Sequence, residues 1–235
     1  MKIDGIDIRK FGARQHRVDI GHMTTKFSNE WEMGDVLPFM GLNSPGFKQV
    51  TVTLVMKGKT RGAIINARSE LLGLLTKPVV IDLNKNTHHF LGVLKTHKET
   101  EVSKERWHNL ELTFECYEYG DDVSAEGASS FSVVNPGTTA SPCIVEITPG
   151  IGSSEITLTG ICRNPITGAD EPVHIPDVTT GKVILLDGIS GLITEDGSIK
   201  EVDMWDLPSL KPGTNTIECD DRLMDIKVTV RPIYM

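Results

Sequence analysis

The sequence lacks the features that mark membrane, secreted and metal-binding proteins. No apolar run approaches the roughly 20 residues that a membrane-spanning helix needs. Residues 1–8 carry two aspartates and no apolar core, so we expect no signal peptide and synthesis in a cytoplasm. No C-x-x-C pair is present, so we expect buried, reduced thiols rather than a zinc or redox site. The four cysteines are Cys116, Cys143, Cys162 and Cys219.

Positive charge is also scarce. The 235 residues include 24 Lys and Arg against 32 Asp and Glu, which gives a formal net charge of −8. A nucleic-acid-binding surface needs a basic patch that displaces phosphate counterions, so this balance argues against such a surface. The same charge suits a protein that lets DNA pass without gripping it.

Catalytic signatures are missing as well. The sequence contains no G-x-S-x-G, no P-loop and no Cys/His nucleophile signature. Glu115 and Glu118 fall in an expected strand, and neither has an identifiable acid or base partner in the sequence. The sequence therefore predicts a protein that is not an enzyme.

Two groups of side chains are candidate metal ligands. One is the histidines His88, His89, His97 and His108, and the other is the aspartates Asp196, Asp220 and Asp221. Adjacent histidines on a strand point to opposite faces, so exposed histidines are the better interpretation. The aspartates lack EF-hand spacing, so we interpret them as solvated turn residues. We expect neither a metal nor another cofactor.

Residues 47–120 predict an α+β domain. Apolar and polar residues alternate over residues 50–56 and again over residues 110–116, which is the period of a half-buried strand. Between them, four apolar residues share one helical stripe over residues 60–76, and Pro78 stops the helix. Residues 79–83 and 88–97 add two strands around a turn. The expected result is one helix packed on an antiparallel sheet.

Residues 1–46 show no sustained period beyond short strands near residues 3–8 and 14–20. Large apolar residues stand isolated among charged ones in this segment: Phe27, Trp31, Met33, Leu37 and Phe39. They need cover, and we expect them to form an arm that lies on a neighbouring subunit. The alternative is a lid that folds back on its own domain.

The residue pattern changes in the second half of the sequence. Residues 120–130 are small, polar and aperiodic, which is typical of a linker or an exposed crossover. About eight short strands follow at turn-punctuated spacing and predict a β-sandwich of the jelly-roll kind. We therefore place two domains at residues 1–125 and 126–235.

Turn signals are dense between Lys182 and Ile217. Asp187-Gly188 and Asp196-Gly197 each end an apolar run, as tight turns do. Pro212-Gly213 suits the centre of a type II turn, because glycine accepts the positive φ that follows the proline. We expect Trp205, which precedes this turn, to pin the loop to the core.

The order of these pieces resembles the C-terminal domain of siphophage distal tail (Dit) proteins. There, a strand and a Gly-rich hairpin precede a segment of the type F/W-x-x-L-x-P-G-x-N-x-I, similar to LPSLKPGTNTI here. The residues that carry the resemblance are Gly188, Gly197, Trp205, Leu207, Pro208, Leu210, Pro212, Gly213, Asn215 and Ile217. Three further stretches resemble the family in the same order. IDGIDIRKFGA (residues 3–13) is similar to the start of Dit N-terminal domains, residues 135–142 to the junction that opens the second domain, and VTVRPIYM (residues 228–235) to the C-terminal end.

The resemblance implies an α+β N-terminal domain that forms a ring and continues the tail tube, followed by an all-β galectin-like jelly-roll sandwich. It implies a structural virion protein, six copies of which form a hub at the tip of a long non-contractile phage tail and leave a channel for DNA. The implied partners are further copies of the chain, the major tail tube protein, a tail-associated hub (Tal-like) protein, the tape measure protein and a receptor-binding protein. DNA passes without specific binding, and no membrane is involved. The implied location is the distal end of the tail, after assembly in the host cytoplasm.

Carbohydrate binding to host cell-wall glycans is the alternative function, because galectin-like sandwiches can be lectins. Sugar C–H faces pack on aromatic rings, and residues 131–235 contain only Phe131, Trp205 and Tyr234. This scarcity weighs against the alternative without removing it. The chain also has no insertion long enough to be an added carbohydrate-binding module.

Overall fold

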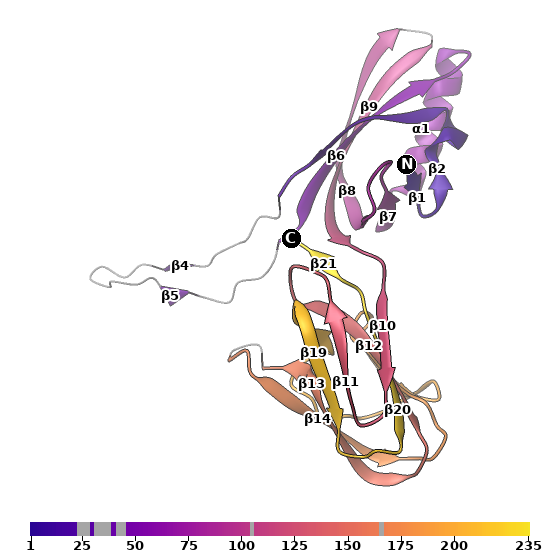
Figure 1. The fold of residues 1–235 in the computed structure, drawn as a ribbon. Helices are drawn as coiled ribbons and strands as arrows, with labels where there is room; N and C mark the ends of the chain where they lie inside the picture. The colour runs from indigo at the N-terminus through magenta and orange to yellow at the C-terminus, as the bar shows by residue number, and fades with distance from the viewer. Residues whose placement is uncertain (23–28, 31–38, 41–45, 104–105, 165–166) are drawn as a thin grey trace. The chain divides into compact units, whose positions relative to one another are not determined.

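The computed structural model describes residues 1–22, 29–30, 39–40, 46–103, 106–164 and 167–235. The chain divides into two compact units, Met1–Tyr119 together with Met235, and Gly120–Tyr234 (Figure 1).

The first unit is built on one antiparallel sheet. Its strands are β1 (Lys2–Ile3), β2 (Ile6–Asp7), β3 (Ala13–Ile20), β6 (Lys48–Lys57), β7 (Val79–Asp82), β8 (His89–Ser103) and β9 (Trp107–Tyr119). They lie in the order β2-β1-β7-β8-β9-β6-β3, and the 3-10 helix η1 (Ile8–Phe11) precedes β3. Strands β4 (Asn29–Glu30) and β5 (Phe39–Met40) pair with each other. The alternating strands predicted over residues 50–56 and 110–116 are confirmed within β6 and β9.

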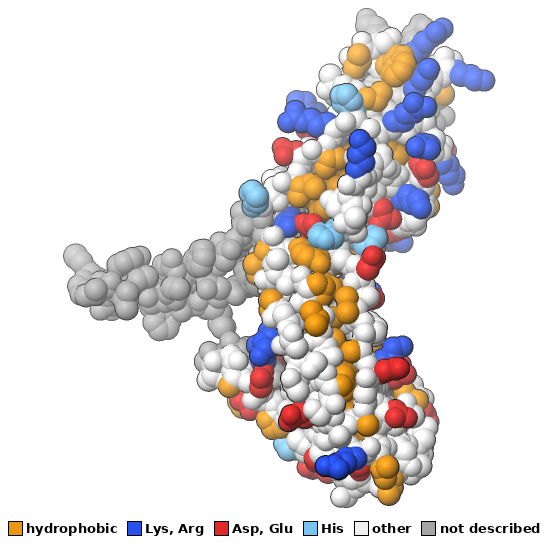
Figure 2. Space-filling view, viewed as in Figure 1, with side chains coloured by type: hydrophobic (Ala, Val, Ile, Leu, Met, Phe, Trp, Pro, Cys, Tyr) orange, Lys and Arg blue, Asp and Glu red, His pale blue; other side chains and the backbone are white. Residues whose placement is uncertain are grey.

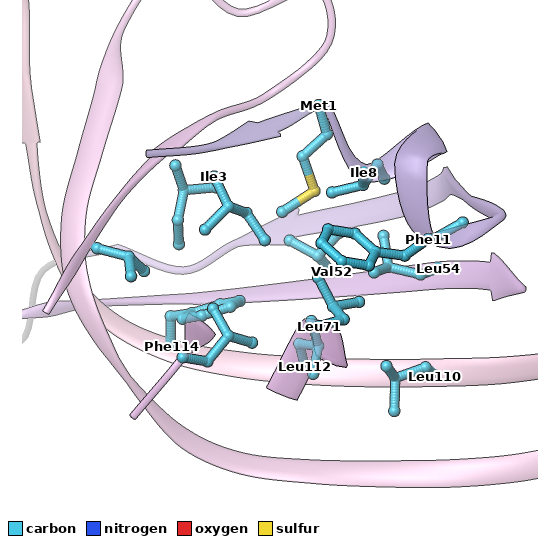
Figure 3. Packing of buried hydrophobic residues seen from close by; sticks show 14 of the residues in the cluster. Met1, Ile3, Ile8, Phe11, Val52, Leu54, Leu71, Leu110, Leu112 and Phe114 are labelled. Atoms are coloured by element: carbon cyan, nitrogen blue, oxygen red, sulfur yellow. The ribbon is translucent and has the colours of Figure 1, made fainter. Parts of the chain in front are cut away.

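The α-helix α1 (Arg61–Leu74) lies against one side of the sheet (Figure 1). Thr60 caps it by accepting a hydrogen bond from the Ala63 N–H at 3.2 Å. Ile64 and Leu71 are buried on the stripe that the sequence predicts. Figure 3 shows Leu71 in the core, where the N-terminal segment and the sheet also contribute side chains. The helix ends at Leu74, four residues before the proline expected to stop it.

Side chains on alternate positions of the sheet face opposite ways. On β6, the residues from Val50 to Met56 at even positions are buried in the core, while Thr51 and Thr53 lie on the opposite face. On β9, Leu110, Leu112 and Phe114 are buried in the same core. The face opposite α1 therefore carries polar residues over much of its length.

The second unit is all-β, and its sheets are antiparallel. Its strands are β10 (Val123–Gly127), β11 (Ser130–Asn135), β12 (Ser141–Pro149), β13 (Ser153–Arg163), β14 (Asp170–Val178), β15 (Ile184–Asp187), β16 (Leu192–Glu195), β17 (Ser198–Ile199), β18 (Ser209–Leu210), β19 (Gly213–Cys219), β20 (Met224–Val230) and β21 (Ile233–Tyr234). One sheet has the order β10-β20-β12-β15-β16-β17, with β18 also on β12, and the other has the order β11-β19-β13-β14. Buried residues of both sheets, such as Val145 and Ile156, form one core. The predicted all-β class is confirmed, and the galectin-like description stays a prediction.

The linker predicted for residues 120–130 is wrong. Val123–Gly127 form β10, which pairs with β20 over its whole length, and the hydroxyls of Ser124 and Thr229 lie 2.9 Å apart. Val123 and Ala125 pack on the core, so the segment does alternate, with residues too small to give a strong periodic signal. The boundary placed between residues 125 and 126 thus falls inside a strand of the second unit, which begins at Gly120.

Candidate functional site

The Asp-Gly turns between Lys182 and Ile217 form as tight turns. The Asp187 carboxylate accepts hydrogen bonds from the backbone of Ile189 at 2.8 Å and Ser190 at 3.1 Å, and from the Ser190 hydroxyl at 2.6 Å. Burial alone would raise the pKa of Asp187, but these hydrogen bonds outweigh it and lower the pKa. At the second turn, Asp196 and Gly197 both adopt positive φ. Asp187 shapes the turn between β15 and β16, and Asp196 and Gly197 form the turn between β16 and β17.

Gly188 is held by a close backbone approach. Its N–H donates to the Cys143 carbonyl at 3.0 Å, and the Cys143 N–H donates to the Pro208 carbonyl, also at 3.0 Å. A Cβ on Gly188 would lie 2.2 Å from the Pro208 oxygen and 2.8 Å from the Cys143 oxygen. No side chain fits there. Gly188 therefore lets the hairpin, β12 and the segment before β18 meet.

Two buried asparagines fasten the segment around Leu210. Asn215 donates from Nδ2 to the Lys211 carbonyl at 2.9 Å and accepts at Oδ1 from the Lys211 N–H at 3.1 Å. Between them, Gly213 has a φ of +89°, as the predicted Pro212-Gly213 turn requires. Asn135 donates from Nδ2 to the Leu210 carbonyl at 2.9 Å. Sequence reasoning missed the role of Asn135, although its place before Pro136-Gly137 marks it as a turn residue.

The residues that carry the resemblance thus divide into three groups. Leu210 and Ile217 are fully buried in the core, and the glycines and Asn215 shape the turns. Trp205 and Leu207 are exposed, at 65% and 39%. The prediction that Trp205 pins its loop to the core is wrong. The backbone of Asp206 anchors the loop instead, through contacts of its N–H and carbonyl with the Cys162 sulfur at 3.4 and 3.3 Å.

The carboxylates of the first unit have partners that the sequence did not reveal. Glu118 lies 2.5 Å from the Lys48 ammonium and 2.6 Å from the His88 Nδ1. Burial alone would raise the pKa of Glu118, but its hydrogen bonds to Lys48 and His88 outweigh this and lower the pKa. Glu115 pairs with Lys95.

Histidines of the first unit also pair with single carboxylates. His108 is buried on β9, and its Nδ1 lies 2.6 Å from Glu99, whose other oxygen pairs with Arg68 of α1. The prediction of exposed histidines is wrong for His108, because Glu99 of the neighbouring strand compensates its burial. His89 lies 2.5 Å from Asp82. Within the described ranges, no group of three or more His, Cys, Asp or Glu could hold a metal ion.

All four cysteines are buried and free, as predicted. Burial raises the pKa of Cys116 and of Cys143 to about 12, so these two thiols stay protonated near neutral pH. A protonated, buried thiol is a poor nucleophile. Neither residue offers catalytic chemistry.

One apolar row stands out on the sheet face opposite α1. Leu91 of β8 pairs in register with Tyr117 of β9, and the Tyr117 ring lies 4.7 Å from the Phe47 ring. Val93 continues the row on β8. These four side chains, which we call the apolar row, are between 37% and 48% exposed. Contiguous exposed apolar residues of this kind mark contact surfaces.

The proposed arm falls mostly outside the described residues: Phe27, Trp31, Met33 and Leu37 are not among them. Phe39 lies in β5 and pairs in register with Glu30 of β4. The assignment of these residues to an inter-subunit arm stays a prediction. No helix in the described part of the chain is long and apolar enough to span a membrane.

A solved phage protein shares this arrangement over nearly its full length. The structure described as "SPP1 Dit (gp 19.1) Protein, a Paradigm of Hub Adsorption Apparatus in Gram-positive Infecting Phages" aligns with a TM-score of 0.78 at 14% identity, covering 99% of this chain and 98% of that chain. The chain has the fold of a Dit protein. The resemblance to the Dit family predicted from the sequence is thereby confirmed at the level of the fold.

Two more phage structures align less closely. They are the phage p2 baseplate in its activated conformation with Sr and with Ca, each with a TM-score of 0.49 and 10% identity over 95% of this chain and 92% of that chain. No family model and no curated protein matches the sequence. The Dit fold therefore rests on the SPP1 structure, and it accounts for the order of the four stretches in which the sequence resembles the family.

Proposed function

We propose that this protein is a structural component of a phage tail tip or baseplate. One observation carries the proposal: the match to SPP1 Dit spans 99% of the chain, and thus both units, at a TM-score of 0.78. SPP1 Dit is described as a paradigm of the hub adsorption apparatus of phages that infect Gram-positive bacteria. A shared single domain would say little about function, because one fold hosts many functions. A shared pair of units in the same order is more specific.

The side chains support a role without catalysis. The partly buried Glu118 and the buried His108 each engage partners within the fold, and the Cys116 and Cys143 thiols are buried with raised pKa values. Groups that are neutralised by structural partners in this way are not poised for acid, base or nucleophilic chemistry. We therefore infer that the protein acts by assembly rather than by reaction.

The finer part of the proposal is a hexameric ring at the distal end of a long non-contractile tail. In this assembly the ring joins the tail tube to the adhesion apparatus and leaves a channel for DNA. The partners would be the tube, Tal-like, tape measure and receptor-binding proteins. A closed ring needs two different surfaces that meet between neighbouring copies. The first unit offers the apolar row on one sheet face and the terminal strand β3 at one end of the sheet order.

Native mass measurement tests the ring. Six copies of the 25.8 kDa chain have a mass of about 155 kDa. We expect Leu91→Lys/Val93→Lys to reduce this mass to that of smaller species, because charge would be placed in the contact. Leu192→Lys/Ile199→Lys, at two exposed apolar residues of the second unit, is the matched control and should leave the assembly intact. A wild-type protein that stays monomeric at all concentrations would contradict the ring.

Carbohydrate binding is kept as a second candidate because of one observation. Trp205, at 65% exposed, presents an indole that sugar rings could stack on. A glycan array probed with wild type and with Trp205→Ala tests it. Binding that disappears in the variant would favour the lectin function, and a blank array with wild type would remove it.

A further inference from the structure

A basic groove lies at one end of the first unit, where β3 begins, β6 ends and β9 begins. A cavity of about 310 Å³ there is lined by Arg9, Arg14, Lys57 and Trp107, among others. Lys57 also lines an adjoining cavity with Lys59 and Arg106. We call the five cations Arg9, Arg14, Lys57, Lys59 and Arg106 the basic end. Apart from Arg14 at the start of β3, these residues lie outside the surfaces proposed for the contact between copies.

Within the described ranges, most cations of the basic end form no ion pair. Among the described residues, no carboxylate lies within 4 Å of Arg14, Lys57, Lys59 or Arg106. Arg9 has only an exposed pairing with Asp7 at 3.9 Å. Elsewhere in the same unit, cations such as Lys48, Arg61 and Arg68 each pair with a glutamate. The cations of the basic end can therefore form ion pairs with carboxylates of another molecule.

The backbone holds these cations in a fixed frame. The Lys57 N–H donates to the Gly12 carbonyl at 2.9 Å, and the Gly58 N–H donates to the Arg106 carbonyl at 3.3 Å. Gly12 has a φ of +66°, and a Cβ on it would lie 2.6 Å from the Lys57 oxygen. The close approach of the strand ends therefore depends on a glycine at residue 12. A fixed frame lowers the entropy that side chains lose when a partner binds.

Helix α1 adds to the positive potential at this corner. It begins just after Lys59, and its first turn contains no acidic residue. The N-terminal end of a helix carries a partial positive charge, which acidic residues in the first turn commonly offset. Here that charge is left uncompensated within the first turn and adds to the charge of the basic end.

The sequence has opposite charge in its two parts. Residues 1–119 contain 17 Lys and Arg against 14 Asp and Glu, and residues 120–235 contain 7 against 18. The overall net charge of −8 therefore hides a basic first unit and an acidic second unit. Figure 2 shows Lys and Arg side chains gathered over the end of the first unit that lies at the top of the view.

We propose that the basic end docks an acidic surface, rich in Asp and Glu, of a different protein chain. Nucleic acid is disfavoured because the Lys57 ammonium lies 4.9 Å from the centre of the Trp107 ring and so occupies a face on which a base would stack. In the proposed ring, the contacts between copies are already assigned to the apolar row and β3. The basic end is therefore assigned to a different chain, and a second copy is one of the outcomes of the test.

The proposal is tested with two variants of the full chain that lose the same charge. The test variant, Lys57→Gln/Lys59→Gln/Arg106→Gln, removes three cations of the basic end. The control variant, Lys2→Gln/Lys85→Gln/Lys98→Gln, removes three exposed cations elsewhere in the first unit. The probes are a fluorescein-labelled acidic peptide of about 16 residues, alternating Glu and Ser, and a labelled DNA duplex of about 16 base pairs. Binding is followed by fluorescence anisotropy at about 30 and about 150 mM NaCl, and melting curves check that both variants fold.

We expect the test variant to weaken peptide binding roughly tenfold and the control variant less than twofold, because local ion pairs outweigh overall charge. Raising the salt should weaken binding to the wild type. Equal losses in both variants, or no peptide binding by the wild type, would overturn the proposal. A selective loss of DNA binding alone would assign the basic end to nucleic acid, and a salt-dependent self-association lost in the test variant would assign it to a second copy. The native mass of the wild type tests the ring, and peptide binding tests the basic end. Failure of one proposal can therefore be told from failure of the other.

Discussion

Gly188 lies so close to Pro208 that a Cβ on the glycine would stand 2.2 Å from the proline carbonyl oxygen. The contact is between backbone atoms, so no side-chain rotation can relieve it. It joins the turn after β15 to the segment that leads into β18. We therefore regard Gly188 as a packing requirement of the second unit rather than a turn preference.

Gly188→Ala should destabilise the second unit by about 1–3 kcal/mol, because the added methyl group forces the backbone apart. Hydrogen exchange should show faster exchange in β12, β15 and β18. Gly73→Ala is the matched control: a Cβ there meets nothing within 4 Å, and alanine favours the helix that contains it. If the two variants behave alike, the close approach does not constrain the fold.

Substitutions at Gly213 test backbone strain without steric crowding. The φ of Gly213 is +89°, but a Cβ there would meet nothing within 4 Å. Gly213→Val should cost about 1–3 kcal/mol through backbone strain alone. Gly213→Asn should cost less, since asparagine tolerates positive φ better than valine does. Thermal melting of the three proteins checks the order. Equal melting temperatures for the Val and Asn variants would show that strain at this turn is unimportant.

The lowered pKa of Glu118 predicts that the first unit loses stability as the pH falls. Its pKa in the folded protein is below the ordinary value of 4.5, so its stabilising contribution is complete above about pH 4.5 and is lost as pH falls through the folded pKa. Urea unfolding between pH 7 and pH 3 should show a steeper loss of stability for wild type than for Glu118→Gln. Lys48→Met should be destabilised even at pH 7, because it leaves the largely buried Glu118 without its cation. Parallel pH profiles for wild type and Glu118→Gln would contradict this account.

Deletion of the segment that contains Phe27, Trp31 and Met33 tests whether it is an arm on a neighbouring subunit or a lid on its own domain. If it is an arm, deletion of residues 22–42 should convert the assembled protein to soluble monomers whose second unit melts normally. If it is a lid, the first unit should unfold or aggregate, because its own core loses cover. Native mass and calorimetry separate these outcomes. A deletion variant that still assembles would exclude both.

The sequence predicts the fold best where burial is periodic. Val52 and Leu54 alternate with threonines on β6, and Ile64 and Leu71 share one face of α1, so one side of each element is apolar and the pattern is visible. The same reasoning fails for β10. There, Val123 and Ala125 are small, and pairing with β20 rather than a large apolar face positions the strand.

Side-chain roles were harder to predict than elements, because they depend on residues distant in sequence. Glu118 finds Lys48 70 residues earlier, and no local pattern signals that pair. Trp205 looked like a core anchor because large aromatic side chains are usually buried. In the structure, the backbone of Asp206 fixes the loop and leaves the indole exposed. The positive φ of Gly213 was predictable, since proline followed by glycine favours one turn type.

Electron microscopy of the purified wild-type protein tests the central claim most directly. The account predicts ring-shaped particles with six-fold symmetry and an open centre, because six copies close through two different surfaces of the first unit. Single compact particles without a central hole, seen even at high protein concentration, would contradict it.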